Sequence, residues 1–163
     1  MPTAIAAPLK VADEVFLVVA ALHRTRPERE DFTVGEIMEQ ARELNLSGGL
    51  RPGVEIHVRQ HSVANLPPNP GRYRTLYAVG KRRRLLAPGD PTHQERDGKI
   101  WPELDEIPAE FHDLVHWARQ RFGMSIVRAA GLSELIGLRG TGRELWRDEP
   151  ADAYVQRLRE NWQ

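Results

Sequence analysis

Cysteine is absent from the 163-residue sequence, which excludes a disulfide framework and any metal site built from thiolates. No apolar run approaches the roughly 20 residues that a membrane-spanning helix needs, so we expect no membrane association. The N-terminal segment lacks a charged region followed by an apolar core and a cleavage site. We therefore expect no secretion signal and a cytoplasmic location. The sequence also contains no internal repeat and no low-complexity tract.

The sequence also has no net charge, because its 23 Lys and Arg residues balance 23 Asp and Glu residues. A chain that bound polyanions over its whole surface would carry an excess of positive charge. The charge is unevenly distributed, however, since residues 51–99 hold ten basic and four acidic side chains. Residues 1–50 and 100–163 each have a net charge of −3. One basic block between two acidic segments predicts a local site for an anionic partner.

Two helices are predicted ahead of the basic block. Apolar side chains recur at helical spacing through residues 9–23, which predicts a largely buried helix. Thr33 and Glu36 have the spacing of a capping box, in which each side chain accepts a hydrogen bond from the other residue's backbone N–H. The helix that they begin should end near Asn45, because Ser47-Gly48-Gly49 supplies a turn.

The basic block divides into a third helix and a hairpin. Residues 51–65 have the pattern of a helix, with Pro52 in the first turn, where a helix accepts proline. Its core-facing side chains are expected to be Val54, Val58 and Val63. After a proline-rich turn, residues 72–86 alternate in the manner of two strands, with Gly80-Lys81 at the tip and three arginines on the return strand.

These elements predict an α+β fold in three parts. Residues 1–90 form a mainly helical domain with a β-hairpin, and residues 91–123 form a linker and a packing helix that begins at Pro108. Within the linker, Trp101 is expected to anchor the chain onto the domain. Residues 124–163 form a C-terminal tail whose amphipathic helix, starting at Pro150, needs a partner surface on its own domain or on another protein.

Catalytic and metal-binding patterns are weak. His57 and His61 lie four residues apart, as do His112 and His116, a spacing that can bind zinc from one helix face. Neither pair has an evident third ligand, and no serine lies in a nucleophile-elbow context. We therefore expect no metal, no cofactor and no enzymatic activity. Convergence of His57 and His61 with acidic side chains in one pocket would favour an enzyme instead.

The basic block also carries the residue types that contact DNA. A polar helix can place Arg and Gln side chains against base edges, while basic residues in a hairpin neutralise phosphates. The residues that we expect to contact DNA are Arg59, Gln60, His61 and Ser62 in the helix and Arg74, Lys81, Arg82, Arg83 and Arg84 in the hairpin.

The order helix, helix, helix, hairpin over residues 9–86 resembles a winged helix-turn-helix domain of the kind found alone or beside bacterial restriction-modification enzymes. The matching segments are residues 32–37 at the second helix, residues 54–65 and the hairpin of residues 73–86. The resemblance implies DNA binding through Arg59, Gln60, Ser62 and the hairpin arginines. Glu55 departs from this pattern, because its carboxylate would repel phosphate unless it meets a cytosine amino group.

The tail carries a second resemblance. Residues 138–146 and 152–162 combine a glycine-rich piece with an amphipathic segment and two tryptophans, and they are similar to the C-terminal tails of antitoxins that neutralise PIN-domain ribonuclease toxins. The resemblance implies that arginines pair with the toxin's carboxylates while aromatic and aliphatic side chains anchor the tail. These residues are Arg139, Arg143, Trp146, Tyr154, Leu158 and Trp162.

Together these observations predict a bacterial sequence-specific DNA-binding protein, the antitoxin and autorepressor of a toxin–antitoxin pair. Its expected partners are double-stranded DNA and a PIN-domain toxin, and a homodimer is a candidate assembly. Two alternatives stay open. One is a winged-helix module that binds proteins without binding DNA, and the other is an accessory domain of a restriction-modification system. The tail can equally pack on its own domain.

Overall fold

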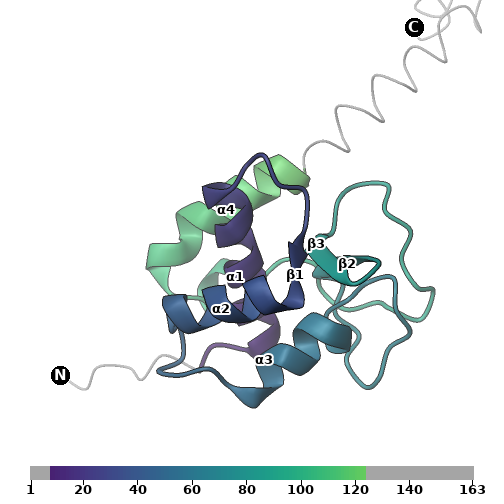
Figure 1. Ribbon diagram of the computed structural model, residues 1–163, viewed down its shortest axis with the longest axis horizontal. Helices are drawn as coiled ribbons and strands as arrows, with labels where there is room; N and C mark the ends of the chain where they lie inside the picture. The colour runs from purple at the N-terminus through teal and green to yellow at the C-terminus, as the bar shows by residue number, and fades with distance from the viewer. Residues whose placement is uncertain (1–7, 124–163) are drawn as a thin grey trace, which may run out of the picture. The chain divides into compact units, whose positions relative to one another are not determined.

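The computed structural model describes residues 8–123, which form an α+β fold with four α-helices and a three-stranded antiparallel sheet (Figure 1). The expected α+β class is confirmed. The elements are, in order, α1 Val11–Thr25, β1 Phe32–Thr33, α2 Val34–Leu44, α3 Pro52–Ile56, the π-helix η1 His57–His61, β2 Leu76–Val79, β3 Arg82–Leu85, the 3₁₀ turns η2 Leu104–Glu106 and η3 Ala109–Phe111, and α4 His112–Phe122. The predictions for residues 124–163 lie outside the described residues.

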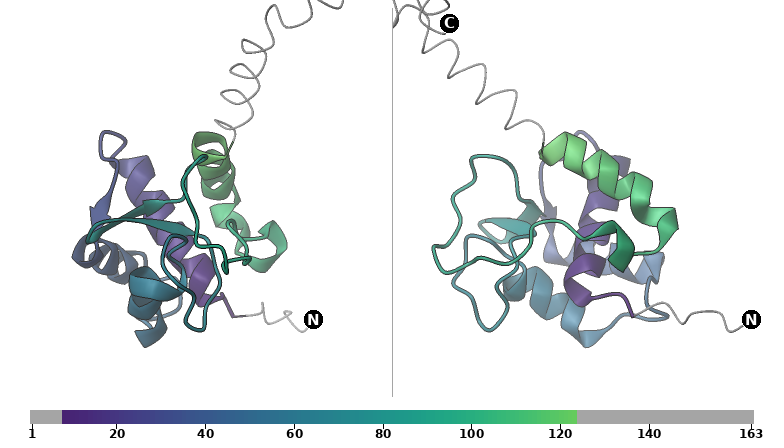
Figure 2. Two further views of the ribbon diagram at one scale, coloured as in Figure 1. Left: turned by 90° about the vertical axis from the view of Figure 1, so that its right-hand side faces the viewer. Right: turned by 180° about the vertical axis from the view of Figure 1, so that it is seen from behind.

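Helix α1 is the centre of the fold. Almost all of its side chains from Ala12 to His23 are buried, and it packs against α2, α3, α4 and β3. Figure 2 shows α1 running between α2 on one side and α4 on the other. Phe16 and Leu17 are at most 1% exposed, which confirms the largely buried helix predicted at residues 9–23. Apolar burial around this helix is the main stabilising contribution to the domain.

The predicted capping box at the start of α2 is confirmed. The Thr33 hydroxyl accepts a hydrogen bond from the Glu36 backbone N–H at 3.2 Å, and the Glu36 carboxylate accepts one from the Thr33 N–H at 2.8 Å. The helix ends at Leu44, and Asn45 adopts a left-handed conformation with φ of 47°. Asparagine tolerates this conformation better than most residues, which explains why the helix stops at the predicted place.

The third helix is shorter than the predicted 51–65. It continues from α3 into the π-helix η1 and ends at His61, after which Val63 pairs with Leu76 beside the sheet. The helix ends there because of a tertiary contact. The Arg96 guanidinium donates hydrogen bonds to the carbonyl oxygens of Gln60 and His61, which then do not continue the helix. The predicted core residues of this helix are confirmed as fully buried, and they are Val54, Val58 and Val63.

The hairpin of β2 and β3 is also confirmed, with Gly80 at the tip in a positive-φ conformation of 57° that favours glycine. Strand β3 begins at Arg82 as predicted, but β2 begins later than predicted, because the Arg74 N–H donates to the Lys99 carbonyl at 3.1 Å instead of joining the ladder. Strand β1 was not predicted and gives the sheet the order β1-β3-β2. The outer edge of β2 is closed by Asn65, whose carboxamide exchanges two hydrogen bonds with the Ala78 backbone.

Residues after the hairpin complete the same core. Val115 and Ala118 of α4 are fully buried and α4 packs on α1. Trp101 contacts Phe16 edge-on with a centroid distance of 6.1 Å, so the expected anchor is confirmed. Within residues 8–123, none of the helices combines the length and the apolar character needed to cross a bilayer.

Candidate nucleic-acid interface

The solvent-facing side of the third helix is a narrow stripe. Pro52, Glu55, Ile56 and Arg59 are exposed and recur at intervals of three and four residues, while Gln60 beside them is half-buried. Arg59 donates from Nε to the Glu55 carboxylate at 2.8 Å, an ion pair at i, i+4 on the helix surface. Arg59 is therefore exposed and Gln60 is half-buried, and Arg59 has an acidic neighbour that a DNA contact would have to displace.

Two predicted DNA contacts at the end of this helix need revision. Ser62 is fully buried, and its hydroxyl lies 2.8 Å from Nδ1 of His57. A buried hydroxyl that is already hydrogen-bonded cannot reach a phosphate or a base, so the prediction for Ser62 is wrong. His61 is half-buried with its ring 5.2 Å from the ring of His57. Burial, with a smaller contribution from His61, lowers the pKa of His57 to about 4.

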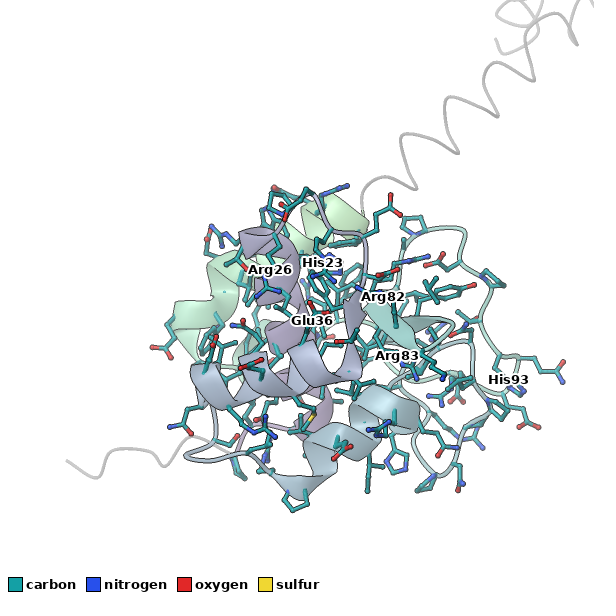
Figure 3. All side chains as sticks on the ribbon, in the orientation of Figure 1. His23, Arg26, Glu36, Arg82, Arg83 and His93 are labelled. Atoms are coloured by element: carbon teal, nitrogen blue, oxygen red, sulfur yellow. The ribbon has the colours of Figure 1, made fainter. Side chains whose placement is uncertain are left out.

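The arginines of β3 are held by the protein itself. Arg82 donates to the Asp31 carboxylate and lies 3.8 Å from Glu36 of α2 (Figure 3). Arg84 forms a two-pronged ion pair with Asp90, at 2.5 and 2.7 Å, and its guanidinium lies 4.5 Å from the Tyr77 ring centre. The hydrogen bond to Asp90 raises the pKa of Arg84. Much of the positive charge predicted for phosphate contact is thus neutralised internally.

Arg83 has a structural position that the sequence did not indicate. It is only 8% exposed and donates to the carbonyl oxygens of Val58 at 3.0 Å and Arg59 at 3.3 Å. Burial lowers the pKa of this guanidinium. The predicted phosphate contact at Arg83 is wrong because the side chain points inward, where it fastens the hairpin to the third helix. The spatial relation between helix and hairpin therefore depends on Arg83.

In the hairpin and the segments beside it, few cations remain at the surface. Lys81 is exposed at the hairpin tip, and Arg72 is exposed with Asp97 at 3.7 Å. Arg74 is half-buried and donates from Nε to the Gly98 carbonyl at 2.8 Å, so it braces the loop before the hairpin. Of the nine predicted DNA contacts, Arg59 and Lys81 are exposed, whereas Gln60 and His61 are half-buried.

Arg96 organises this region and was missed at the sequence level. It is 3% exposed and donates to five backbone carbonyls at 2.6–3.2 Å. The acceptors belong to Gln60, His61, Leu66, Pro67 and Tyr73. Burial lowers the pKa of the guanidinium. One side chain thus holds the end of η1 and the loop that leads to the hairpin.

Two buried carboxylates on α1 are paired with cations, and one of them, Glu14, holds the start of the third helix. Glu14 is 1% exposed and accepts hydrogen bonds from Arg51 Nε at 2.8 Å and from the Ser47 hydroxyl at 3.0 Å. Asp13, also 1% exposed, pairs with Lys99 at 2.9 Å, and its burial raises its pKa. Both pairs neutralise a buried carboxylate, and the Glu14 contacts hold Arg51 at the start of the helix that carries the exposed stripe.

One cavity of the described residues lies apart from the two histidines of the third helix. A cavity of about 600 Å³ lies near the ends of α1 and α2, with Ser47, Arg51 and Glu106 in its wall, and neither His57 nor His61 lines it. Within residues 8–123, no group of three or more His, Asp or Glu side chains could hold a metal ion.

Comparisons with known proteins identify no relative: no family model, no curated protein and no solved structure matches this chain.

Proposed function

We propose that this protein binds double-stranded DNA as a winged helix-turn-helix, with the exposed stripe of the third helix in the major groove and the hairpin tip beside it. The observation that carries the proposal is the way Arg83 ties β3 to the Val58 and Arg59 carbonyls. This tether holds the solvent-facing helix stripe and the exposed Lys81 of the hairpin in one fixed arrangement. A groove-binding helix and a basic hairpin that move together are what recognition of a duplex requires.

Fewer residues are proposed to contact DNA than were expected from the sequence. Arg59 and Gln60 are assigned to base edges or phosphates, and Lys81 to a phosphate. Arg82, whose side chain is 37% exposed, can add a phosphate contact only if it exchanges Asp31 for the DNA. The few exposed cations on this face of residues 8–123 imply modest affinity with a shallow dependence on salt.

The test is a binding titration with genomic fragments at several salt concentrations. We expect Arg59→Ala and Lys81→Ala each to weaken binding and to lower the slope of log affinity against log salt by about 0.9 for each phosphate that is no longer neutralised. Arg121→Ala is the matched control, because Arg121 is an exposed arginine on α4, and α4 packs on α1. Slopes that change equally in all three variants would show that this face is not the interface.

A second candidate function is a protein-docking module. It is favoured by the exposed apolar side chains Ile56 and Val79 and by the acidic Glu55 in the same helix stripe. Gel-shift assays with genomic fragments, run beside co-purification from the source cells, separate the two candidates. A captured protein together with no duplex binding would support the module.

For the whole chain, we propose an antitoxin that also represses its own operon. The proposed toxin contacts, from Arg139 to Trp162, lie outside the described residues, so this part rests on the resemblance of the tail. Co-expression with the product of the adjacent reading frame tests it. We expect a stable complex that dissociates when Arg139 and Arg143 are both changed to Ala, whereas Arg121→Ala leaves it intact.

A further inference from the structure

Ile56 occupies an unusual place on the exposed helix stripe. Its side chain is 50% exposed, and within residues 8–123 only Val79, at 42%, is a comparably exposed large apolar residue. Glu55 precedes Ile56 and Arg59 follows one turn later, and these two form an ion pair across the stripe. An apolar side chain thus lies beside a direct Glu55–Arg59 ion pair on the surface proposed to enter the major groove.

The chemistry of the major groove matches this arrangement. Its floor is mostly hydrogen-bond donors and acceptors, and the apolar group that it displays is the methyl at C5 of a pyrimidine. A protein-docking anchor would instead lie in a continuous apolar patch, whereas the neighbours of Ile56 on the stripe include the Glu55–Arg59 ion pair. The observations therefore favour a single methyl group as the partner of Ile56.

We propose that Ile56 reads the C5 methyl of a pyrimidine, either thymine or 5-methylcytosine, at a fixed position of the bound duplex. This inference rests on the proposed DNA binding. Three helical residues span about 4.5 Å, which is comparable with the roughly 3.4 Å between base pairs. Arg59 therefore reaches the same base pair as Ile56 or the adjacent one. Glu55 gains a favourable role in this geometry, since its carboxylate can accept a hydrogen bond from a cytosine amino group.

The experiment uses a duplex selected for binding by the full chain. Each thymine is replaced in turn by uracil, which removes only the methyl group, and each cytosine is replaced in turn by 5-methylcytosine. We expect one position at which the methyl group strengthens binding. The expected increase in affinity is about fourfold, which corresponds to the burial of one methyl-sized group. A thymine at that position identifies the first source, and a cytosine whose methylation raises affinity identifies the second.

Ile56→Ala should abolish this methyl dependence while leaving the thermal unfolding temperature unchanged, because the side chain is half-exposed. Val79→Ala is the matched control, an exposed apolar residue at the end of β2 that should retain the fourfold difference. Methyl dependence that survives in Ile56→Ala, or that is absent from the wild-type protein, would overturn the inference while the proposed DNA binding stands. Failure of the wild-type protein to bind any duplex would overturn both.

Discussion

Replacing Arg96 by Met tests whether one buried guanidinium organises the end of the third helix. Met has a similar length and volume but no donors, so the five carbonyl oxygens that Arg96 now serves at 2.6–3.2 Å would lose their partner. The Gln60 carbonyl keeps a second donor, the Val63 N–H at 3.1 Å, and is the least affected. The change therefore removes about four hydrogen bonds for which residues 8–123 supply no second donor.

The expected cost follows from these contacts. Hydrogen bonds to a charged donor contribute about 1.5–3 kcal/mol each to stability. The desolvation of the buried Arg96 guanidinium offsets part of this contribution. Water will also reach some of the freed carbonyls, because Pro67 is exposed and Leu66 is half-buried. We therefore expect Arg96→Met to lower the free energy of unfolding by about 3–5 kcal/mol, a large share of the typical 5–15 kcal/mol.

Equilibrium urea unfolding followed by far-ultraviolet circular dichroism measures this change. Arg96→Lys should fall between the two proteins, because an ammonium has three donors and lacks the planar fork. The control is Arg72→Met, an exposed arginine whose removal should cost less than about 0.5 kcal/mol. If Arg96→Met costs less than about 1 kcal/mol, the guanidinium does not hold this region and the geometry of the stripe must have another cause.

Two further predictions concern the fold. Burial between Phe32 and Phe122 lowers the pKa of His23 to about 4, so between pH 6.5 and 4 the unfolded chain binds a proton that the folded protein excludes. Stability should therefore fall by about 2 kcal/mol from pH 7.5 to pH 5 on account of His23, and an equally steep fall in His23→Gln would contradict this. Truncation after Gly123 should leave a folded domain that still binds DNA, because the core of residues 8–123 is built from its own side chains. Loss of the cooperative thermal transition in the truncated chain would show that the tail belongs to that core.

The features predicted correctly are those determined by neighbours in the sequence. The capping box at Thr33 and Glu36 and the hairpin tip at Gly80 depend on residues within a few positions of one another. The buried face of residues 9–23 follows from helical spacing alone. Strand β1 was missed because two residues, Phe32 and Thr33, are too short to show an alternating pattern and are recognisable only by their pairing with β3.

The contacts of the charged side chains could not be predicted from the sequence. Arg82, Arg83 and Arg84 form one uniform basic run in the sequence, yet they meet Asp31, two backbone carbonyls of the third helix and Asp90 respectively. Their roles differ because alternate residues of a strand point to opposite faces of the sheet. Only Arg83 is buried, and it does not lie at the DNA-facing surface that its charge suggested.

The sequence by itself determined the α+β class, the starts of the second and third helices, the hairpin and the location of the basic block, because local spacing and composition are sufficient for these. The tertiary structure alone decided which cations remain at the surface, where the third helix ends and which side chains form its exposed stripe. The physical reason is that a long polar side chain selects its partner from whatever the fold brings within about 3 Å. For Arg96 those partners are carbonyls 23 to 36 residues away, a distance in the sequence at which no local pattern can indicate a contact.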